Sequence, residues 1–246
     1  MAVAALLTYA VIVVCTGTCR AFGLKLGRYI PPGPNDARGP CPAFNTMANH
    51  GVFPRDGSPV SLSRLIFGFR QFLSVSPSLT LAFYAGARSL GLTTNGRVDP
   101  LKLRTHNKIE HDVSLVRDDS RLGSNYVVNH TMIDQLVSSS SDGKYLTMRD
   151  MAKFRRERVA DSRANNPDLT FGPREDVIGL GEAAFLFAIL GNPLRARAIP
   201  LGSLTSFLRD EKLPKGFRPP FLPIGPAQMG LVVGRLKATS ALLKNA

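Results

Sequence analysis

One cysteine is set apart in this sequence by its neighbours. Cys41 lies between two prolines, and the other two of the three cysteines fall within the first 19 residues. A thiol without a nearby partner is suited to ligate a metal or to react as a nucleophile. Pro42 has the fixed φ of a first helical position, so we expect Cys41 to be the N-cap of a short helix over residues 42–49. The free N–H groups and dipole at that end would favour a thiolate able to ligate iron.

A free cysteine is also often a small buried apolar side chain, and the Pro-Cys-Pro sequence alone leaves both interpretations open. Glu110 and Ser114 are four residues apart, so their oxygens face the same way if the segment is helical or tightly turned. On the residues alone, a surface carboxylate and a capping serine are the simpler interpretation.

Glu182 interrupts an apolar run over residues 177–187. A carboxylate there is costly to bury unless it is paired or protonated, which makes Glu182 a candidate proton carrier.

Three blocks of sequence carry a family resemblance. Residues 39–57 read Gly-Pro-Cys-Pro-Ala-Phe-Asn-Thr-Met-Ala-Asn-His-Gly-Val-Phe-Pro-Arg-Asp-Gly. This stretch closely resembles the proximal signature of the haem-thiolate peroxidases, the family of chloroperoxidase and the unspecific peroxygenases. Residues 110–114, Glu-His-Asp-Val-Ser, match the family's Glu-His-Asp-x-Ser element. Residues 179–186 look like the helix that carries its distal glutamate, and the three blocks occur in family order.

The resemblance implies roles for five residues. Cys41 would be the axial ligand of the iron of haem b, and Glu182 the distal acid–base residue. His111 would be its partner, because the short branch of the family pairs glutamate with histidine and the long branch pairs it with arginine. Glu110, Ser114 and the backbone carbonyl of His111 would ligate a structural Mg²⁺ near a haem propionate, a cation that prefers such oxygen ligands.

Seven residues before Glu182 lies Glu175, so the arginine of the long branch is not cleanly matched.

The remaining histidines lie in less specific sequence contexts. His50 belongs to the proximal block, and we expect it to orient the cysteine loop. His106 and His130 are expected at the surface.

Helical spacing indicates the walls of a substrate pocket. Ile178 and Phe185 share the face of Glu182, and Ile109 precedes the metal block. A mostly aliphatic wall with an aromatic residue suits bulky apolar substrates.

The resemblance therefore implies a hydrogen-peroxide-dependent peroxygenase or peroxidase that acts on small apolar organic molecules through a ferryl intermediate, and it leaves halide oxidation open. The alternatives are an exported, haem-free binding or structural protein of the same fold and a redox-active thiol protein. The presence of Cys41, Glu110, His111, Ser114 and Glu182 argues against the first. The lack of a resolving cysteine near Cys41 argues against the second.

The chain is long enough for one sizeable core, with 246 residues of which 44% are hydrophobic. Its 22 glycines and 18 prolines indicate many loops. We expect a mostly α, single-domain haem-thiolate peroxidase fold over residues 22–246, with proline-rich extended loops. Periodicity and capping residues predict helices over 42–49, 61–72, 77–90, 131–137, 148–164, 173–190, 200–211 and 227–243, and a short strand over 144–147.

Residues 1–19 carry no charge, and residues 1–15 are nearly all apolar. This run is shorter than the ~20 residues that span a bilayer, and small residues follow at Gly17, Cys19 and Ala21, as in a secretory signal. Because a charged n-region is missing, an uncleaved anchor is the alternative. We therefore expect residues 1–21 to be a signal peptide of a secreted, extracellular protein, or an anchor that holds it to the exported side of a membrane.

The formal net charge of +13 could attract nucleic acid, anionic polymers or acidic lipid. The densest basic run, residues 153–158, is expected to be a solvated helix face. Zinc spacings and aromatic RNA-binding motifs are missing from the sequence, so we expect no nucleic-acid binding.

Overall fold

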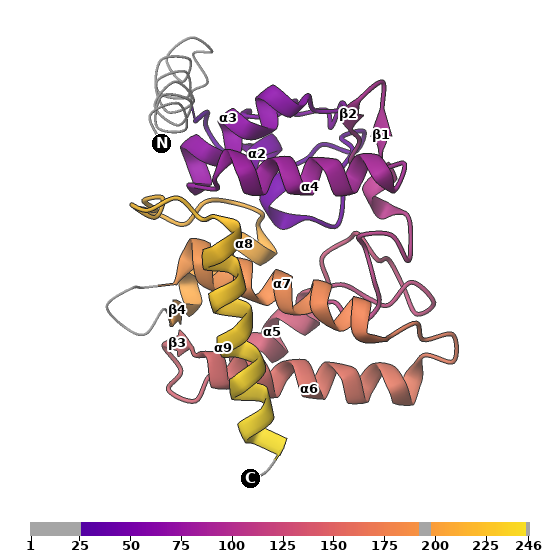
Figure 1. Cartoon of the computed structure of the whole chain (residues 1–246), viewed down its shortest axis with the longest axis vertical. Coiled ribbons are helices and arrows are strands. Elements are labelled where there is room, and N and C mark those ends of the chain that lie inside the picture. The colour runs from indigo at the N-terminus through magenta and orange to yellow at the C-terminus, as the bar shows by residue number, and fades with distance from the viewer. Residues whose placement is uncertain (1–25, 192–197, 245–246) are drawn as a thin grey trace, which may run out of the picture.

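The computed structural model of the protein describes residues 26–191 and 198–244. Within these ranges the chain is mostly helical, as predicted (Figure 1). The helices are α2 (Pro42–Asn49), α3 (Leu62–Leu73), α4 (Pro77–Ser89), α5 (His130–Ser138), α6 (Met148–Asn165), α7 (Pro173–Leu190), α8 (Leu201–Arg209), α9 (Pro226–Lys244) and the 3-10 helix η1 (Lys102–Arg104). The strands form two antiparallel pairs, β1 (Thr93–Thr94) with β2 (Arg97–Val98) and β3 (Tyr145–Leu146) with β4 (Ile199–Pro200).

Two groups of helices share one core. Helix α9 packs against α6 and α7, and these lie with α5 and α8 in the lower part of Figure 1, whereas α2, α3 and α4 lie at its upper end. A continuous cluster of buried apolar side chains includes Met47 of α2, Phe187 of α7, Leu204 of α8 and Leu236 of α9. This shared core holds the helix that follows Cys41 and the helix that carries Glu182 in one body.

Side-chain caps define where the helices begin. Ser61, Ser76, Asn129 and Thr147 each accept a hydrogen bond from the backbone N–H three residues further on. Such caps satisfy N–H groups that have no partner inside the helix. Because these signals are local, most predicted helices begin and end within two residues of those observed.

Helix α4 is more exposed than its composition indicates. Its mostly apolar sequence predicts a buried helix, but Leu81 is 50% exposed and Phe83 is 45% exposed. Only Leu79, Thr80 and Ala87 of α4 are buried. Helix α4 packs along α3, and one apolar side of it is left uncovered by the described residues.

The basic run in α6 corrects one expectation. It is not a wholly solvated face, because Arg155 and Arg158 are buried. Arg155 forms an ion pair with Asp176 of α7, and Arg158 pairs with Asp119 and Asp161. These partners come from other segments or an adjacent turn, and they offset part of the cost of removing the charges from water.

The expected signal or anchor over residues 1–21 lies outside the described residues. Among the helices that the structure describes, none is both long and apolar enough to cross a bilayer. The domain boundaries stay a prediction.

Gly57 provides a test of how closely the turn before α3 packs. Its φ is +78°, and a Cβ added there would lie 2.1 Å from the Ala37 carbonyl oxygen. We expect Gly57→Ala to lower the free energy of unfolding by about 2–4 kcal/mol, because the left-handed conformation and a backbone clash both oppose it. Thermal unfolding followed by circular dichroism measures this.

The matched control is Gly91→Ala. Gly91 has a similar φ of +75°, but an added Cβ would meet nothing within 4 Å. It should cost only the conformational part, about 1 kcal/mol. Equal losses in the two variants would show that the approach of Ala37 to Gly57 is unimportant for stability.

Candidate active site

Cys41 is the N-cap of α2, as predicted, and its thiol is free and partly buried. The backbone N–H groups of Phe44 and Ala43 and the charge of Arg117 favour the thiolate, yet burial outweighs them and raises the pKa of the thiol. The helix end therefore favours the thiolate, as the sequence predicts, but does not by itself offset the burial of the sulfur. The N–H groups near the sulfur suit a thiolate ligand whose negative charge is compensated by a bound metal ion.

A buried polar network fixes the start of α2. Asn45 donates to the Gly39 carbonyl at 2.7 Å and to Oε1 of Glu211 at 2.7 Å. Arg38 donates through two nitrogens to Oδ1 of Asn49. Both asparagines are one or two turns beyond Cys41, so the segment that enters α2 and the segment that follows α8 are tied to the same helix.

Glu211 and Arg117 form the charged part of this network. Arg117 Nη2 lies 2.9 Å from Glu211 Oε1, and both side chains are buried. Burial raises the pKa of the Glu211 carboxyl, while Arg117 and Asn45 oppose the shift. Removing one member would leave the other as an unpaired buried charge, which is strongly destabilising.

His50 joins two distant segments to the end of α2. Its Nδ1 lies 3.0 Å from the Gly27 carbonyl oxygen, and the N–H of Leu213 donates to its Nε2 at 3.2 Å. With one nitrogen donating and the other accepting, the ring is neutral, and burial lowers its pKa accordingly. Both nitrogens are used in this structural role.

Glu110 is buried beside a histidine expected at the surface. Its Oε2 lies 2.8 Å from Nδ1 of His106, whose side chain is only 29% exposed, so the expectation for His106 is wrong. His130 is exposed, as expected. The second carboxylate oxygen of Glu110, Oε1, is buried without a partner. Burial raises the pKa of Glu110, and His106 opposes that shift.

The loop after Glu110 is held by two buried aspartates. Asp112 accepts from the N–H groups of Ser120 and Thr170. Asp119 accepts from the N–H of Val113 at 2.9 Å. Val113 has a φ of +63°, which is unusual for a β-branched residue and is maintained here by these bonds. Sequence reasoning missed the role of both aspartates, although Asp112 belongs to a matched block.

This loop brings two of the expected Mg²⁺ ligands together. The Ser114 hydroxyl donates to the backbone carbonyl of His111 at 3.2 Å. Together with the unpartnered Oε1 of Glu110, these are oxygen ligands of the kind that Mg²⁺ prefers. In the described part of the chain, no group of three or more His, Cys, Asp or Glu residues could hold a metal.

His111 and Glu182 face each other without a hydrogen bond. Nε2 of His111 lies 3.6 Å from Oε1 of Glu182. Nδ1 of His111 is 2.6 Å from the Asp112 carbonyl and donates to it, and Nε2 is buried without a hydrogen-bond partner. The side chain of Glu182 is 42% exposed on α7 and lies beside this ring, the partner that the resemblance implies.

Gly179 allows this approach, and sequence reasoning gave it no role. A Cβ at Gly179 would lie 3.3 Å from Cε1 of His111 and 2.6 Å from Nη1 of Arg155. His111 and Arg155 therefore pack directly against the backbone of α7, one turn before Glu182. A glycine three residues before a glutamate on a helix is the only signal the sequence offers.

Two of the predicted pocket residues, Ile178 and Phe185, lie on α7 on the same face as Glu182. Phe185 lies against Phe83 of α4, with ring centroids 5.6 Å apart, so the exposed apolar side of α4 meets this part of α7. Ile109 and Ile178 are both partly buried. Their assignment to a substrate pocket stays a prediction, and Phe83 is an added candidate.

Comparison with known proteins identifies the family of this chain. The family described as "Peroxidase, family 2" matches residues 27–221. An aromatic peroxygenase of Coprinellus radians is 28% identical over 76% of this chain and 80% of its own length. An aromatic peroxygenase of Cyclocybe aegerita is 29% identical over 76% of this chain and 56% of its length, and a chloroperoxidase of Leptoxyphium fumago is 29% identical over 67% and 48%.

The chain thus covers most of one relative but only about half of the other two. The family match includes Cys41, the loop of Glu110 and the helix of Glu182. The chain belongs to peroxidase family 2, the haem-thiolate peroxidases.

Proposed function

We propose that this protein uses hydrogen peroxide to oxidise small apolar organic molecules, aromatic ones among them, at a thiolate-ligated haem b. Family membership supports the haem, and the names of two relatives support aromatic substrates. Halide is a further proposed substrate, because a chloroperoxidase is among the relatives. The observation that carries the proposal is the pairing of an N-cap thiol with an unpartnered His111 Nε2 beside Glu182.

Cys41 would hold the iron on the proximal side. The N–H groups of Ala43 and Phe44 approach its sulfur and stabilise negative charge there. Haem with a thiolate ligand supplies the electron donation that favours cleavage of the peroxide O–O bond. The network of Asn45, Glu211 and Arg117 keeps the helix end in place while the sulfur is ligated.

Glu182 and His111 would move the proton on the distal side. The exposed carboxylate of Glu182 can take a proton from one peroxide oxygen and return it to the other, so that water leaves. The ring of His111 is held in place because its Nδ1 donates to the Asp112 carbonyl, which leaves Nε2 free toward Glu182. It would accept or return the proton of Glu182 between turnovers.

A divalent cation would complete the loop of Glu110. The buried Oε1 of this residue lacks a partner, and the Ser114 hydroxyl and His111 carbonyl are neighbours. We propose Mg²⁺ at these three oxygens, beside a haem propionate. The cation would compensate the charge of the Glu110 carboxylate and hold His111, whose ring faces Glu182, in place.

We further propose that the protein is exported. The uncharged, apolar residues 1–19 support this. N-terminal sequencing of material from the culture medium should begin near residue 18 or 22. Intact Met1 in a membrane fraction would favour the anchor instead.

The visible spectrum tests the proposed function most directly. Purified protein, reduced under carbon monoxide, should show the red-shifted Soret band of thiolate-ligated haem, because Cys41 would be the axial ligand. Cys41→Ser should lose that band or lose haem. Active protein with full haem and the unshifted band of histidine ligation would overturn the assignment.

Glu182→Gln should slow the reaction with hydrogen peroxide by roughly 10²–10⁴-fold, the usual contribution of general acid–base catalysis. Stopped-flow spectroscopy of the haem absorbance measures this rate. His111→Gln should do less and should change the pH profile, since the Glu182 carboxylate remains.

The control for both variants is Glu157→Gln, which removes an exposed carboxylate of α6. It should react at the unmodified rate. A Glu182→Gln variant that reacts as fast as the control would show that proton transfer occurs elsewhere.

Elemental analysis tests the cation site. Holoprotein should contain about one Mg²⁺ per haem, and Glu110→Gln should lose the cation and retain haem poorly, because one ligand charge is removed. Ser114→Ala should lower the affinity of the protein for the cation by about tenfold or more. Active holoprotein without any divalent metal contradicts the site.

A further inference from the structure

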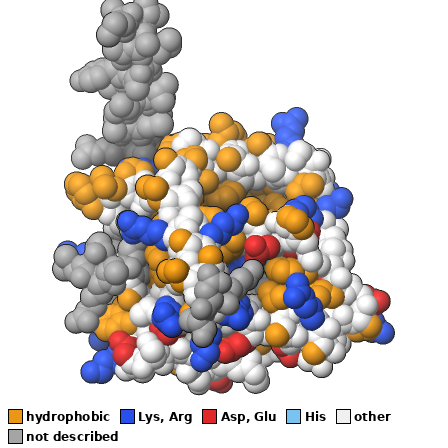
Figure 2. All heavy atoms as spheres, turned by 60° about the horizontal axis from the view of Figure 1, so that its bottom comes forward, with side chains coloured by type: hydrophobic (Ala, Val, Ile, Leu, Met, Phe, Trp, Pro, Cys, Tyr) orange, Lys and Arg blue, Asp and Glu red, His pale blue; other side chains and the backbone are white. Residues whose placement is uncertain are grey.

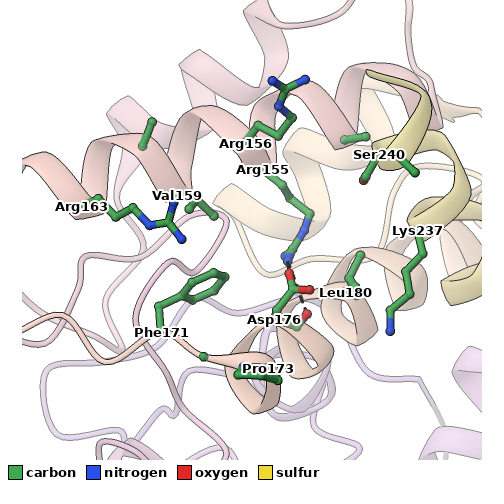
Figure 3. Close-up of a pocket in the computed structure, with 14 residues that line it drawn as sticks. Arg155, Arg156, Val159, Arg163, Phe171, Pro173, Asp176, Leu180, Lys237 and Ser240 are labelled. Carbon is green, nitrogen blue, oxygen red and sulfur yellow. Dashed lines mark hydrogen bonds and ion pairs between the residues drawn. The ribbon is translucent and has the colours of Figure 1, made fainter. Parts of the chain in front are cut away.

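A cavity lies away from the face that carries Glu182. It has a volume of about 710 Å³ and lies between α6, α7 and α9 (Figure 3). Asp176 and Leu180 line it from α7. They lie on the side of the helix roughly opposite to Ile178 and Glu182, since successive residues advance by about 100°. The cavity therefore opens on the side of α7 away from Glu182, although Arg155, which lines it, also packs against Gly179 beside His111.

Small side chains explain why the helices leave a space here. Val232 and Leu236 of α9 are buried against its neighbours. One turn further, α9 presents Ser240 and Ala241, and α6 presents Ala152 and Ala160 across from them. The side chains in this part are too short to fill the gap between the helices. The volume falls in the range of about 300–1,000 Å³ that is usual for small-molecule sites.

The walls of the cavity are largely apolar at the base and basic at the rim. Leu180 and Phe171 contribute apolar surface. The charged groups are four cations and a single carboxylate, namely Arg155, Arg156, Arg163, Lys237 and Asp176. An anion is favoured at such a rim, and Figure 2 shows Lys and Arg side chains spread around hydrophobic patches over the end of the molecule turned forward there.

Two of the four cations are already committed. Arg155 forms its ion pair with Asp176 at 2.9 Å, and Arg156 donates to the Leu243 carbonyl. Arg163 and Lys237 have no hydrogen-bond or ion-pair partner among the described residues. They approach the opening from opposite sides, Arg163 from α6 and Lys237 from α9 (Figure 3). Uncompensated positive charge therefore lies at the rim, next to apolar surface.

We propose that this cavity binds a small organic anion with an apolar body, such as a medium-chain carboxylate. The apolar body would cover Leu180 and Phe171, and the carboxylate would remain at the rim near Arg163 or Lys237. The volume of the cavity, and the position of both unpaired cations at its rim, suit a molecule with an apolar body and one charged end. This site would be distinct from the substrate site of the oxidation reaction, and the inference does not depend on that reaction.

Titration calorimetry of the holoprotein with octanoate tests the proposal. Octanoate should bind with one saturable site, and 1-octanol should bind at least tenfold more weakly, because it lacks the charge. Replacing both free cations, in the double variant Arg163→Gln/Lys237→Gln, should weaken octanoate by about tenfold or more. The single variants show which cation contributes more.

The matched control is Lys153→Gln/Arg235→Gln. It removes the same charge from the same two helices at exposed positions that do not line the cavity. Its affinity for octanoate should stay within twofold of the unmodified protein. Ala160→Trp, which fills the cavity while leaving every charge in place, should abolish binding.

Three results would overturn the proposal. These are a failure of octanoate to saturate a site, equal affinities of the two double variants for octanoate, and a binding affinity that Ala160→Trp leaves unchanged. Binding at the oxidation site instead would give equal affinities in the two double variants and would shift the haem absorbance when octanoate is added.

Discussion

The part of the candidate site around Cys41 depends on the interactions of the buried carboxylate of Glu211. This carboxylate accepts hydrogen bonds from Asn45 and Arg117, and the backbone carbonyl of Glu211 accepts one from Asn49. A carboxylate removed from water must be compensated, and here the compensation comes from α2 and from the loop that follows Ser114. The position of Cys41 is thus fixed by polar bonds that only the assembled fold can provide.

The part of the candidate site around His111 depends on a loop that has no repeating backbone hydrogen bonds of its own. Asp112 and Asp119 replace them with bonds from their carboxylates to backbone N–H groups. Arg158 of α6 lies against Asp119 and donates to the Ser114 carbonyl, which connects the loop to a regular helix. A loop supported in this way can hold His111 at a constant distance from α7.

The sequence predicted those parts of the protein whose signals are local. Helix periods, serine caps and Pro42 define elements within a few residues of themselves, so the helices and the N-cap position of Cys41 were predicted correctly. The exposure of Glu182 and the burial of Arg155 depend on which helices cover which face. That information lies in contacts between distant segments, and no residue pattern in α6 or α7 reports it. The contact of Gly179 with His111 is of the same kind.

The residues of the site come from widely separated parts of the chain: Cys41, His111, Glu182 and Glu211 meet only when all the helices are in place. Closing such long loops is costly in entropy, so the binding site for the cofactor exists only late in folding. A group that binds the native state alone stabilises it in proportion to the logarithm of its concentration over its dissociation constant. A greater supply of cofactor would therefore raise the stability of the folded chain, as well as the fraction of it that is active.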